Sequence, residues 1–254
     1  MKPTPPLLRR LVDRAAAAAG LRVTRRRPEN RFDAMGETLA ALASRGYAPR
    51  VVIDGGSNVG QWAGTAHQVF PDAAFHLVEP QPGCHPALEA LGWPRLTLHK
   101  TALTAPGQAS VRMITMDDTG HGTGSFVARP GEFDHDPDMT VPAATLDALF
   151  ASRVTADDRV LLKLDLEGHE REALDGARAL LRMVEVLVLE VRFYDFEQSG
   201  RGTFGEMVEW LAARGFALYD VAALGGRPSD GRLKIGDVLF VRAGTPLVAS
   251  ASWE

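Results

Sequence analysis

One segment constrains the fold of this chain more than any other, the run VVIDGGSNVGQ at 51–61. A β-branched stretch ends in Asp54, passes through glycines and enters a helical pattern, which predicts a buried parallel strand, a tight turn and a helix N-terminus. The turn has no lysine, so it does not match GxxxxGK[ST], and it does not match GxGxxG. Because an acid at the strand tip would repel a pyrophosphate, the turn favours a cationic or amino-bearing ligand. Asp54 could reach an ammonium group directly or through water.

A second acidic strand end supports this interpretation. The run FHLVEP at 75–80 predicts another strand that ends at Glu79, in the place where such sheets usually hold a ribose diol. An acidic glycine loop followed by a ribose-binding acid is the pattern that we expect for S-adenosylmethionine (SAM), and not for NAD or ATP. The residues expected at this cofactor site are Asp54, Gly55, Gly56, Asn58, Gly60, Gln61, Glu79 and Pro80.

The residue types in the loop suggest separate roles. Gly55 and Gly56 would let the backbone approach a ligand closely, and Gly60 would let a strand and a helix pack tightly. Asn58 or Gln61 could hold the methionine carboxylate at the helix N-terminus.

A cluster of ionisable residues follows another predicted strand, in LLKLDLEGHE at 161–170. The carboxyl ends of strands in open α/β sheets form the ligand crevice, and acids gather there when they share a cation, a proton or a ligand. Asp165 would face the sulfonium and the acceptor hydroxyl. His169 or Glu167 could accept the hydroxyl proton. Glu170 could equally favour the first turn of the next helix through the helix dipole.

Glu190 lies near the carboxyl end of the next predicted strand, so we expect it beside Asp165. Two carboxylates on adjacent strand ends could hold a divalent cation such as Mg²⁺. Arg192 or Lys163 could equally pair with them, so the sequence leaves a metal site at Asp165 and Glu190 open. Our ranking for the general base is Asp165, then His169, then Glu190. Asp237, at the start of the last strand, is interpreted as structural.

Strand and helix patterns alternate along most of the chain, which predicts βαβ units and a parallel sheet. The last two strands are joined by a turn without a helix, which predicts an antiparallel final strand. The expected fold is therefore a Rossmann-like α/β sheet of the class I methyltransferase type, mostly parallel, with helices on both faces. Residues 104–142 interrupt the alternation and suggest a hairpin and loop inserted on the sheet. The expected strands are 50–54, 74–79, 95–100, 160–165, 184–191, 216–221 and 236–242, and the expected helices are 32–47, 59–69, 83–91, 168–181 and 204–214.

Composition limits the partners. The chain has 254 residues, 45% of them hydrophobic, and its single Cys84 excludes a disulfide framework and a cysteine-built zinc site, which favours a reducing cytoplasm. No apolar run approaches the ~18–20 residues of a membrane span. Residues 1–31 carry a net charge of +7 and the rest −11. An acidic body argues against a nucleic-acid substrate. We expect a basic helical arm or lid at 1–48, which could support a homodimer, followed by one catalytic domain at 49–254.

Taken together, these motifs make the chain resemble the FkbM-type SAM-dependent methyltransferases over roughly residues 50–242. The resemblance rests on DGGSNVGQ at 54–61, EP at 79–80, TAL at 101–103, VPAATLD at 141–147 and, most specifically, LKLDLEGHE at 162–170. It implies O-methylation of a hydroxyl on a small molecule such as a sugar, glycolipid or polyketide-type secondary metabolite. It assigns Asp54, Gly56, Asn58, Glu79 and Asp165 to the cofactor site or active centre, and it does not support His169 as an obligatory base.

Thr101, Ala102 and Leu103 are also expected at the cofactor site, where Leu103 and neighbouring apolar residues would enclose the adenine. The 117–138 loops and the N-terminal helices are candidates for an acceptor lid. Ala- and Arg-rich usage fits a bacterial natural-product or envelope-glycan enzyme. Two alternatives stay open, an NAD-dependent oxidoreductase on a similar sheet and a non-catalytic SAM-binding scaffold. A nucleic-acid methyltransferase is a third, weaker one.

Overall fold

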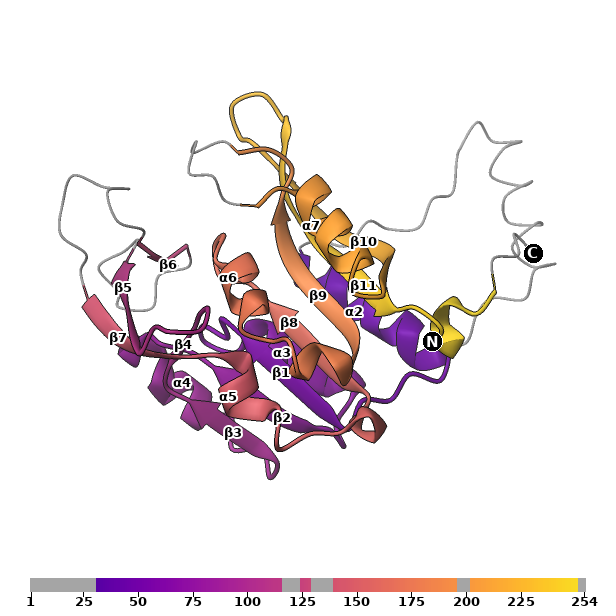
Figure 1. Cartoon of the computed structure of the whole chain (residues 1–254), viewed down its shortest axis with the longest axis horizontal. Coiled ribbons are helices and arrows are strands. Elements are labelled where there is room, and N and C mark those ends of the chain that lie inside the picture. Colours follow the sequence, from indigo (N-terminus) through magenta and orange to yellow (C-terminus); the bar gives the residue numbers. More distant parts are fainter. Residues whose placement is uncertain (1–30, 116–123, 129–138, 196–201, 251–254) are drawn as a thin grey trace, which may run out of the picture.

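The central element of the computed structural model is a seven-stranded sheet, drawn in Figure 1. The structure describes residues 31–115, 124–128, 139–195 and 202–250. The strand order is β10-β11-β9-β8-β1-β2-β3, and only β11 runs antiparallel to its neighbours, as the sequence predicts. The strands are β1 Val51–Gly55, β2 Ala74–Val78, β3 Leu96–His99, β8 Val160–Leu164, β9 Val184–Arg192, β10 Phe216–Gly226 and β11 Leu233–Arg242.

Helices cover both faces of this sheet, as expected. One face packs against α2 Arg31–Ser44, α3 Gln61–Val69 and α4 His85–Glu89, and the other against α5 Leu146–Phe150, α6 Glu170–Asp175 and α7 Phe204–Ala212. Side chains alternate along β1, because Val52 joins the first core and Val51 and Ile53 join the second. Burial on both faces explains why the strands are continuous apolar runs. The described residues also form four short 3-10 turns, η1 Pro82–Cys84, η2 Ala156–Asp158, η3 Leu180–Arg182 and η4 Pro246–Val248.

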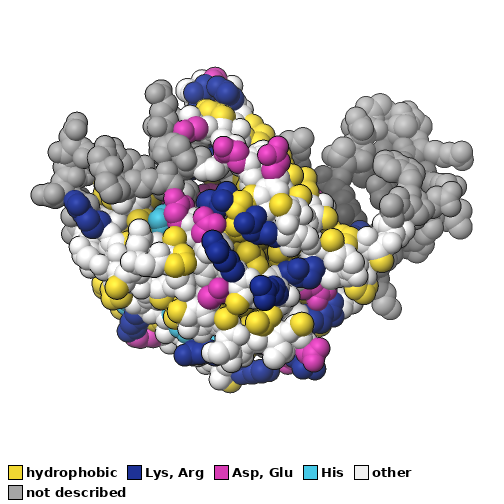
Figure 2. All heavy atoms as spheres, viewed as in Figure 1, with side chains coloured by type: hydrophobic (Ala, Val, Ile, Leu, Met, Phe, Trp, Pro, Cys, Tyr) yellow, Lys and Arg dark blue, Asp and Glu magenta, His cyan; other side chains and the backbone are white. Residues whose placement is uncertain are grey.

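Helix α2 belongs to the same hydrophobic core as the sheet. Its side chains Met35, Leu39 and Leu42 are buried together with Trp62 of α3. The basic arm is expected at 1–48, and its residues 1–30 lie outside the described residues, as does most of the 117–138 loop region. Homodimer formation through the arm stays a prediction. Within the described part of the chain, no helix is both long enough and apolar enough to cross a membrane. On the face shown in Figure 2, acidic, basic and apolar side chains are interspersed.

The insertion between β3 and β8 differs from the predicted hairpin. It forms a separate four-stranded sheet of order β4-β7-β5-β6, with a small core that includes Val111, Met113 and Val141. Proline inside a strand weakens the sequence signal, and Pro142 lies within β7, which the pattern did not predict. The strands are β4 Ala102–Leu103, β5 Ser110–Ile114, β6 Phe126–Val127 and β7 Met139–Ala144.

The single helix predicted over 168–181 is wrong, because the structure has two shorter elements there, α6 and the 3-10 turn η3. Helix α6 ends at Asp175, and a Cβ atom at Gly176 would lie 2.5 Å from the carbonyl oxygen of Thr104. The Asp147 carboxylate then accepts hydrogen bonds from the backbone N–H groups of Ala179 (3.0 Å) and Leu180 (2.8 Å). These contacts come from residues distant in sequence, so local helical periodicity could not predict the break.

Candidate active site

A pocket lies where β1, β2 and β8 end, because β1 pairs with both of the other strands. The empty space in this pocket, open solvent included, amounts to about 910 Å³. Nine of the residues expected at the cofactor site line it, namely Gly56, Asn58, Gln61, Glu79, Pro80, Thr101, Ala102, Leu103 and Asp165. Glu167 and His169 line it too. The remaining expected residues, Asp54, Gly55, Gly60 and Glu190, do not.

The loop glycines are required mainly by the protein itself. Gly56 has φ +74°, and a Cβ there would lie 2.0 Å from the carbonyl oxygen of Asp165. A Cβ at Gly55 would lie 2.7 Å from side-chain atoms of Leu103 and of Leu164. Both glycines let the loop pack against the end of β8 and the adjoining Leu103. Their expected role in the approach of a ligand stays a prediction.

Gly60 behaves as predicted for tight packing, although it lies away from the pocket. It precedes α3 with φ +86°, and a Cβ there would contact Leu88 and Leu91 at 3.1 Å. The helix start has no side-chain cap among the described residues, and Gln61 and Trp62 of its first turn line the pocket. Uncapped backbone N–H groups at a helix N-terminus form a site for an anion.

The structure corrects the role expected for Asp54. The side chain is fully buried, and its Oδ1 lies 2.9 Å from Nζ of Lys163, which also donates to the carbonyl oxygens of Gly55 (3.4 Å) and Gly56 (3.0 Å). Burial lowers the pKa of Lys163, but the charges of Asp54 and Asp165 outweigh it and the pKa is raised. Asp54 therefore cannot reach a ligand ammonium directly, and its charge is neutralised inside the protein.

Glu79 closes the loop at the end of β2. Its carboxylate is buried and accepts hydrogen bonds from the backbone N–H groups of Asn58 (2.7 Å) and Gln81 (2.9 Å). Burial raises the pKa of Glu79 although these hydrogen bonds lower it. The acid predicted for the ribose thus also fixes the loop. We call Asp54, Glu79, Lys163 and residues 55–61 the glycine-loop side of the site.

Opposite it lies a group of four acids, which we call the carboxylate cluster: Asp165, Glu167, Glu190 and Asp237. One oxygen from each of the first three lies within 4.8 Å of the others. Asp237, interpreted from sequence as only structural, faces Glu190 across the β9–β11 pair and joins them. Burial, and next the charge of Asp165, raise the pKa of Glu190 well above its usual value. The prediction that strand ends bring Asp165 and Glu190 together is correct.

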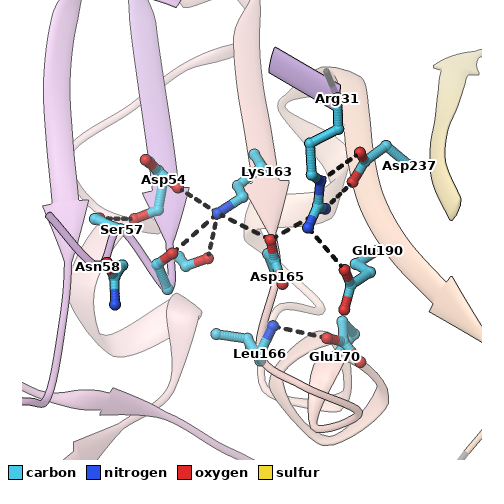
Figure 3. Close-up of polar contacts among 12 residues, drawn as sticks. Arg31, Asp54, Ser57, Asn58, Lys163, Asp165, Leu166, Glu170, Glu190 and Asp237 are labelled. Atoms are coloured by element: carbon cyan, nitrogen blue, oxygen red, sulfur yellow. Dashed lines mark hydrogen bonds and ion pairs between the residues drawn. The ribbon is translucent and has the colours of Figure 1, made fainter. Parts of the chain in front are cut away.

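The cation of this cluster is Arg31, the first residue of α2, as Figure 3 shows. Its guanidinium donates to Asp237 (Nε to Oδ2, 2.9 Å, and a second bond from Nη2). It also pairs with Glu190 (3.1 Å) and Asp165 (3.4 Å). Burial lowers the pKa of Arg31, but the hydrogen bond to Asp237 and the three carboxylate charges outweigh it and raise it. Lys163, which the sequence offered as a partner, pairs with Asp54 and also lies 3.9 Å from Oδ2 of Asp165. Arg192, the other candidate, donates a hydrogen bond to the Glu167 carbonyl.

Glu170 holds the turn that carries the cluster. Its Oε1 accepts hydrogen bonds from the backbone N–H groups of Leu166 (2.7 Å) and Gly168 (3.2 Å). Between them Glu167 adopts φ +53°, a conformation that needs such support. Burial raises the pKa of Glu170 to about 7. The side chain stabilises this turn more directly than a helix dipole would.

His169 is held by a buried hydroxyl. Its Nε2 lies 3.1 Å from Oγ1 of Thr104, and that hydroxyl donates its proton to Gln108 (2.7 Å). Because the proton of Thr104 is already used, Nε2 must act as the donor. With Nε2 protonated, only Nδ1 could accept a proton, and this buried atom lies 3.8 Å from Oε2 of Glu172. This position inside the protein places His169 below Asp165 as a candidate base.

Sequence reasoning missed several residues of the pocket. Lys163 carried a signal, because a charged residue inside a buried strand needs an ionic partner. Arg31 carried none, since it was one basic residue among many in the arm. The other unpredicted lining residues are Phe32, Ser57, Trp62, Val78, Gln81, Met113, Gly124, Ser125, Phe126, Val127 and Leu166. Those at 124–127 come from the loop region expected to face the acceptor.

The chain is similar to known methyltransferases. The family described as Methyltransferase FkbM domain matches residues 54–218, more than half of the chain. Solved structures with similar folds include the 1,6-didemethyltoxoflavin-N1-methyltransferase of Burkholderia thailandensis (13% identity, 96% of this chain and 92% of that one, TM-score 0.46). They also include a methyltransferase of Geobacter sulfurreducens (12%, 96% and 91%, 0.43) and an rRNA methylase of Streptococcus thermophilus (13%, 87% and 99%, 0.45). No curated protein matches significantly.

Proposed function

The chain belongs to the FkbM methyltransferase family, and on that premise we propose that it transfers a methyl group from SAM to a hydroxyl of a small molecule. A sugar, glycolipid or polyketide-type metabolite is the expected acceptor class. The observation that carries the proposal is one pocket lined both by residues of the glycine-loop side and by Asp165 and Glu167 of the carboxylate cluster. Family membership removes the support for an oxidoreductase.

The glycine-loop side fits SAM by its donors and acceptors. The uncapped first turn of α3 offers backbone N–H groups to the carboxylate of the amino-acid moiety. Glu79 offers a carboxylate at the pocket wall for the ribose hydroxyls. Ala102 and Leu103 are buried apolar residues at the pocket edge that suit an adenine face. When bound, SAM supplies a methyl group on a sulfonium centre that leaves as a neutral thioether.

The carboxylate cluster suits the acceptor. An alcohol is a poor nucleophile, so a base that takes its proton is expected to contribute ~10²–10⁴-fold. We assign this role to Asp165, because its carboxylate lines the pocket and is only partly covered. The basic nitrogen of His169, Nδ1, is buried and lies 3.8 Å from Glu172. Orienting the acceptor oxygen close to the methyl group can supply on the order of 7–11 kcal/mol in the best cases. The insertion residues 124–127 would form part of the acceptor wall.

Calorimetric titration with S-adenosylhomocysteine (SAH), with NADH as the control, tests the cofactor. We expect micromolar SAH binding and no heat with NADH. Replacing Glu79 with Gln should weaken SAH binding about 10–100-fold, because a hydrogen bond to a charged group contributes roughly 1.5–3 kcal/mol. Absence of SAH binding to the wild type would overturn the proposal.

An acceptor screen against sugars and polyketide-type alcohols then tests the reaction. Replacing Asp165 with Asn should lower kcat by ~10²–10⁴-fold at saturating SAM while SAH still binds. Equal transfer rates for the two proteins would remove Asp165 from the role of base.

A further inference from the structure

Three strands bring their acids to one point beside the pocket, where Asp165 and Arg31 line its wall. The cation comes from a helix near the other end of the sequence. Asp165 follows β8, Glu190 lies in β9 and Asp237 in β11, and all three contact the guanidinium of Arg31. Asp237 and Arg31 are 206 residues apart. Figure 3 shows the guanidinium pointing into the space between these carboxylates.

The same space has the ligand set of a divalent-cation site. Carboxylate oxygens of Asp165, Glu167 and Glu190 lie within 4.8 Å of one another, and hard cations such as Mg²⁺ and Mn²⁺ take carboxylate oxygens. Two of these three residues already contact Arg31. A guanidinium and a dication cannot share the position, since their charges repel at such short distances.

The cluster needs a positive charge. Glu190 and Asp237 are buried, and a buried carboxylate without a partner is strongly destabilising. Arg31 provides that charge, and its planar fork of donors can meet three carboxylates at once, which an ammonium does less well. The Arg31 side chain is 38% exposed to solvent and lines the pocket, so it is not part of the buried core.

We propose that Arg31 is a positioning residue of the acceptor site, which occupies the place of a divalent cation and orients Asp165 toward the pocket. The proposal rests on the proposed function for the part that concerns the acceptor, but its central claim concerns cation occupancy. The wild-type protein should therefore have no divalent-cation site in the pocket. Removing the guanidinium should create one.

The test uses Mn²⁺ as the probe and the full-length chain. Mn²⁺ binding is measured by calorimetry and by loss of the free-ion EPR signal for the wild type, Arg31→Ala and Arg31→Lys. We expect Arg31→Ala to bind Mn²⁺ at least about tenfold more tightly than the wild type, a difference of ~1.4 kcal/mol. Arg31→Lys keeps the positive charge and should stay close to the wild type.

A matched control is available just past the end of the same helix. Arg45 contacts the hydroxyl and ring of Tyr219, and it does not line the pocket. Arg45→Ala removes the same charge from the same region and should leave Mn²⁺ binding unchanged. Adding Asp165→Asn and Glu190→Gln to Arg31→Ala should abolish the new binding, which would place it in the cluster.

SAH titration of each variant separates this proposal from the proposed function. Arg31→Ala should bind SAH within about threefold of the wild type, because the hydrogen bonds and ion pairs of Arg31 go to Asp165, Glu190 and Asp237. That result also shows that the variant is folded. Tight Mn²⁺ binding by the wild type, or equal Mn²⁺ binding by the wild type and Arg31→Ala, would overturn the role of Arg31. Should Arg31→Ala fail to fold, Arg31→Gln, which retains the side-chain bulk and a donor, gives the same readout. Failure of SAH to bind to any of the proteins would overturn the proposed function alone.

Discussion

The glycine-loop side and the carboxylate cluster both place acids at strand ends, but they compensate the charge differently. Asp54 is fully buried against Lys163, and Glu79 accepts from two backbone N–H groups. The carboxylate cluster instead depends on Arg31, a partly exposed residue at the beginning of a helix. The first arrangement is locked, because every charge has a buried partner nearby. We call the second arrangement adjustable, because its cation remains in contact with solvent.

The largest effect should come from breaking the locked side at Lys163. Lys163→Met leaves Asp54 buried without its ionic partner, which costs about 3–5 kcal/mol in comparable cases. Urea denaturation should show this loss, and Lys163→Met combined with Asp54→Asn should recover part of it, since no unpaired charge remains. The control Lys100→Met affects an exposed ion pair with Glu89 and should cause no measurable change. A double variant as unstable as Lys163→Met would show that Lys163 acts through its carbonyl contacts alone.

Two glycines on either side of the α3 start give the next contrast. Gly56→Ala places a Cβ 2.0 Å from the Asp165 carbonyl at a positive φ, so we expect a loss of roughly 2–4 kcal/mol from strain and overpacking. Gly64→Ala lies within α3 with nothing within 4 Å of the added atom. It should stabilise the protein by about 0.5–1 kcal/mol. Thermal unfolding of both variants measures the difference, and similar Tm shifts would contradict the packing described for the loop.

The turn beneath the carboxylate cluster makes a pH-dependent prediction. The folded-state pKa of Glu170 is raised from 4.5 to about 7, so the folded protein holds this proton more tightly than the unfolded chain. The resulting stability is present below pH ~4.5 and is lost as the pH rises toward 7. A shift of this size corresponds to roughly 3 kcal/mol. Glu170→Gln, which keeps an acceptor for Leu166 and Gly168, should lack this loss. Parallel stability–pH curves for the two proteins would show that Glu170 titrates normally.

The smallest effect is expected on the adjustable side. Asp237→Asn removes one carboxylate from a cluster that holds more acids than cations, so lost attraction to Arg31 is offset by reduced repulsion. Because Arg31 is partly exposed, the net change in unfolding free energy should stay below about 1 kcal/mol and shrink with added salt. Denaturation at low and high salt tests this. A cost comparable to that of Lys163→Met would mean that the two sides are equally locked.

Prediction from sequence succeeded where residues that are close together in the sequence determine the structure. The order of strands and helices, the antiparallel last strand, and the meeting of Asp165 with Glu190 follow from hydrophobic periodicity and from the rule that parallel strands present their carboxyl ends together. It failed where distant residues decide the outcome. The break at Gly176 depends on Thr104 and Asp147, and the separate four-stranded sheet depends on pairing across a long insertion.

The sequence by itself therefore determined the α/β sheet, the glycine loop, the acids at the strand ends and the family. Each of these is encoded in a short run of residues. The backbone preferences and the apolar spacing of that run favour one local structure. Only the tertiary structure decided which charges meet. Asp54, which the sequence suggested as a contact for a ligand, pairs with Lys163, 109 residues away. Arg31, one of the basic residues near the N-terminus, pairs with Asp237, 206 residues away. Ion pairs are set by distance and burial in three dimensions, and neither quantity is written in the local sequence.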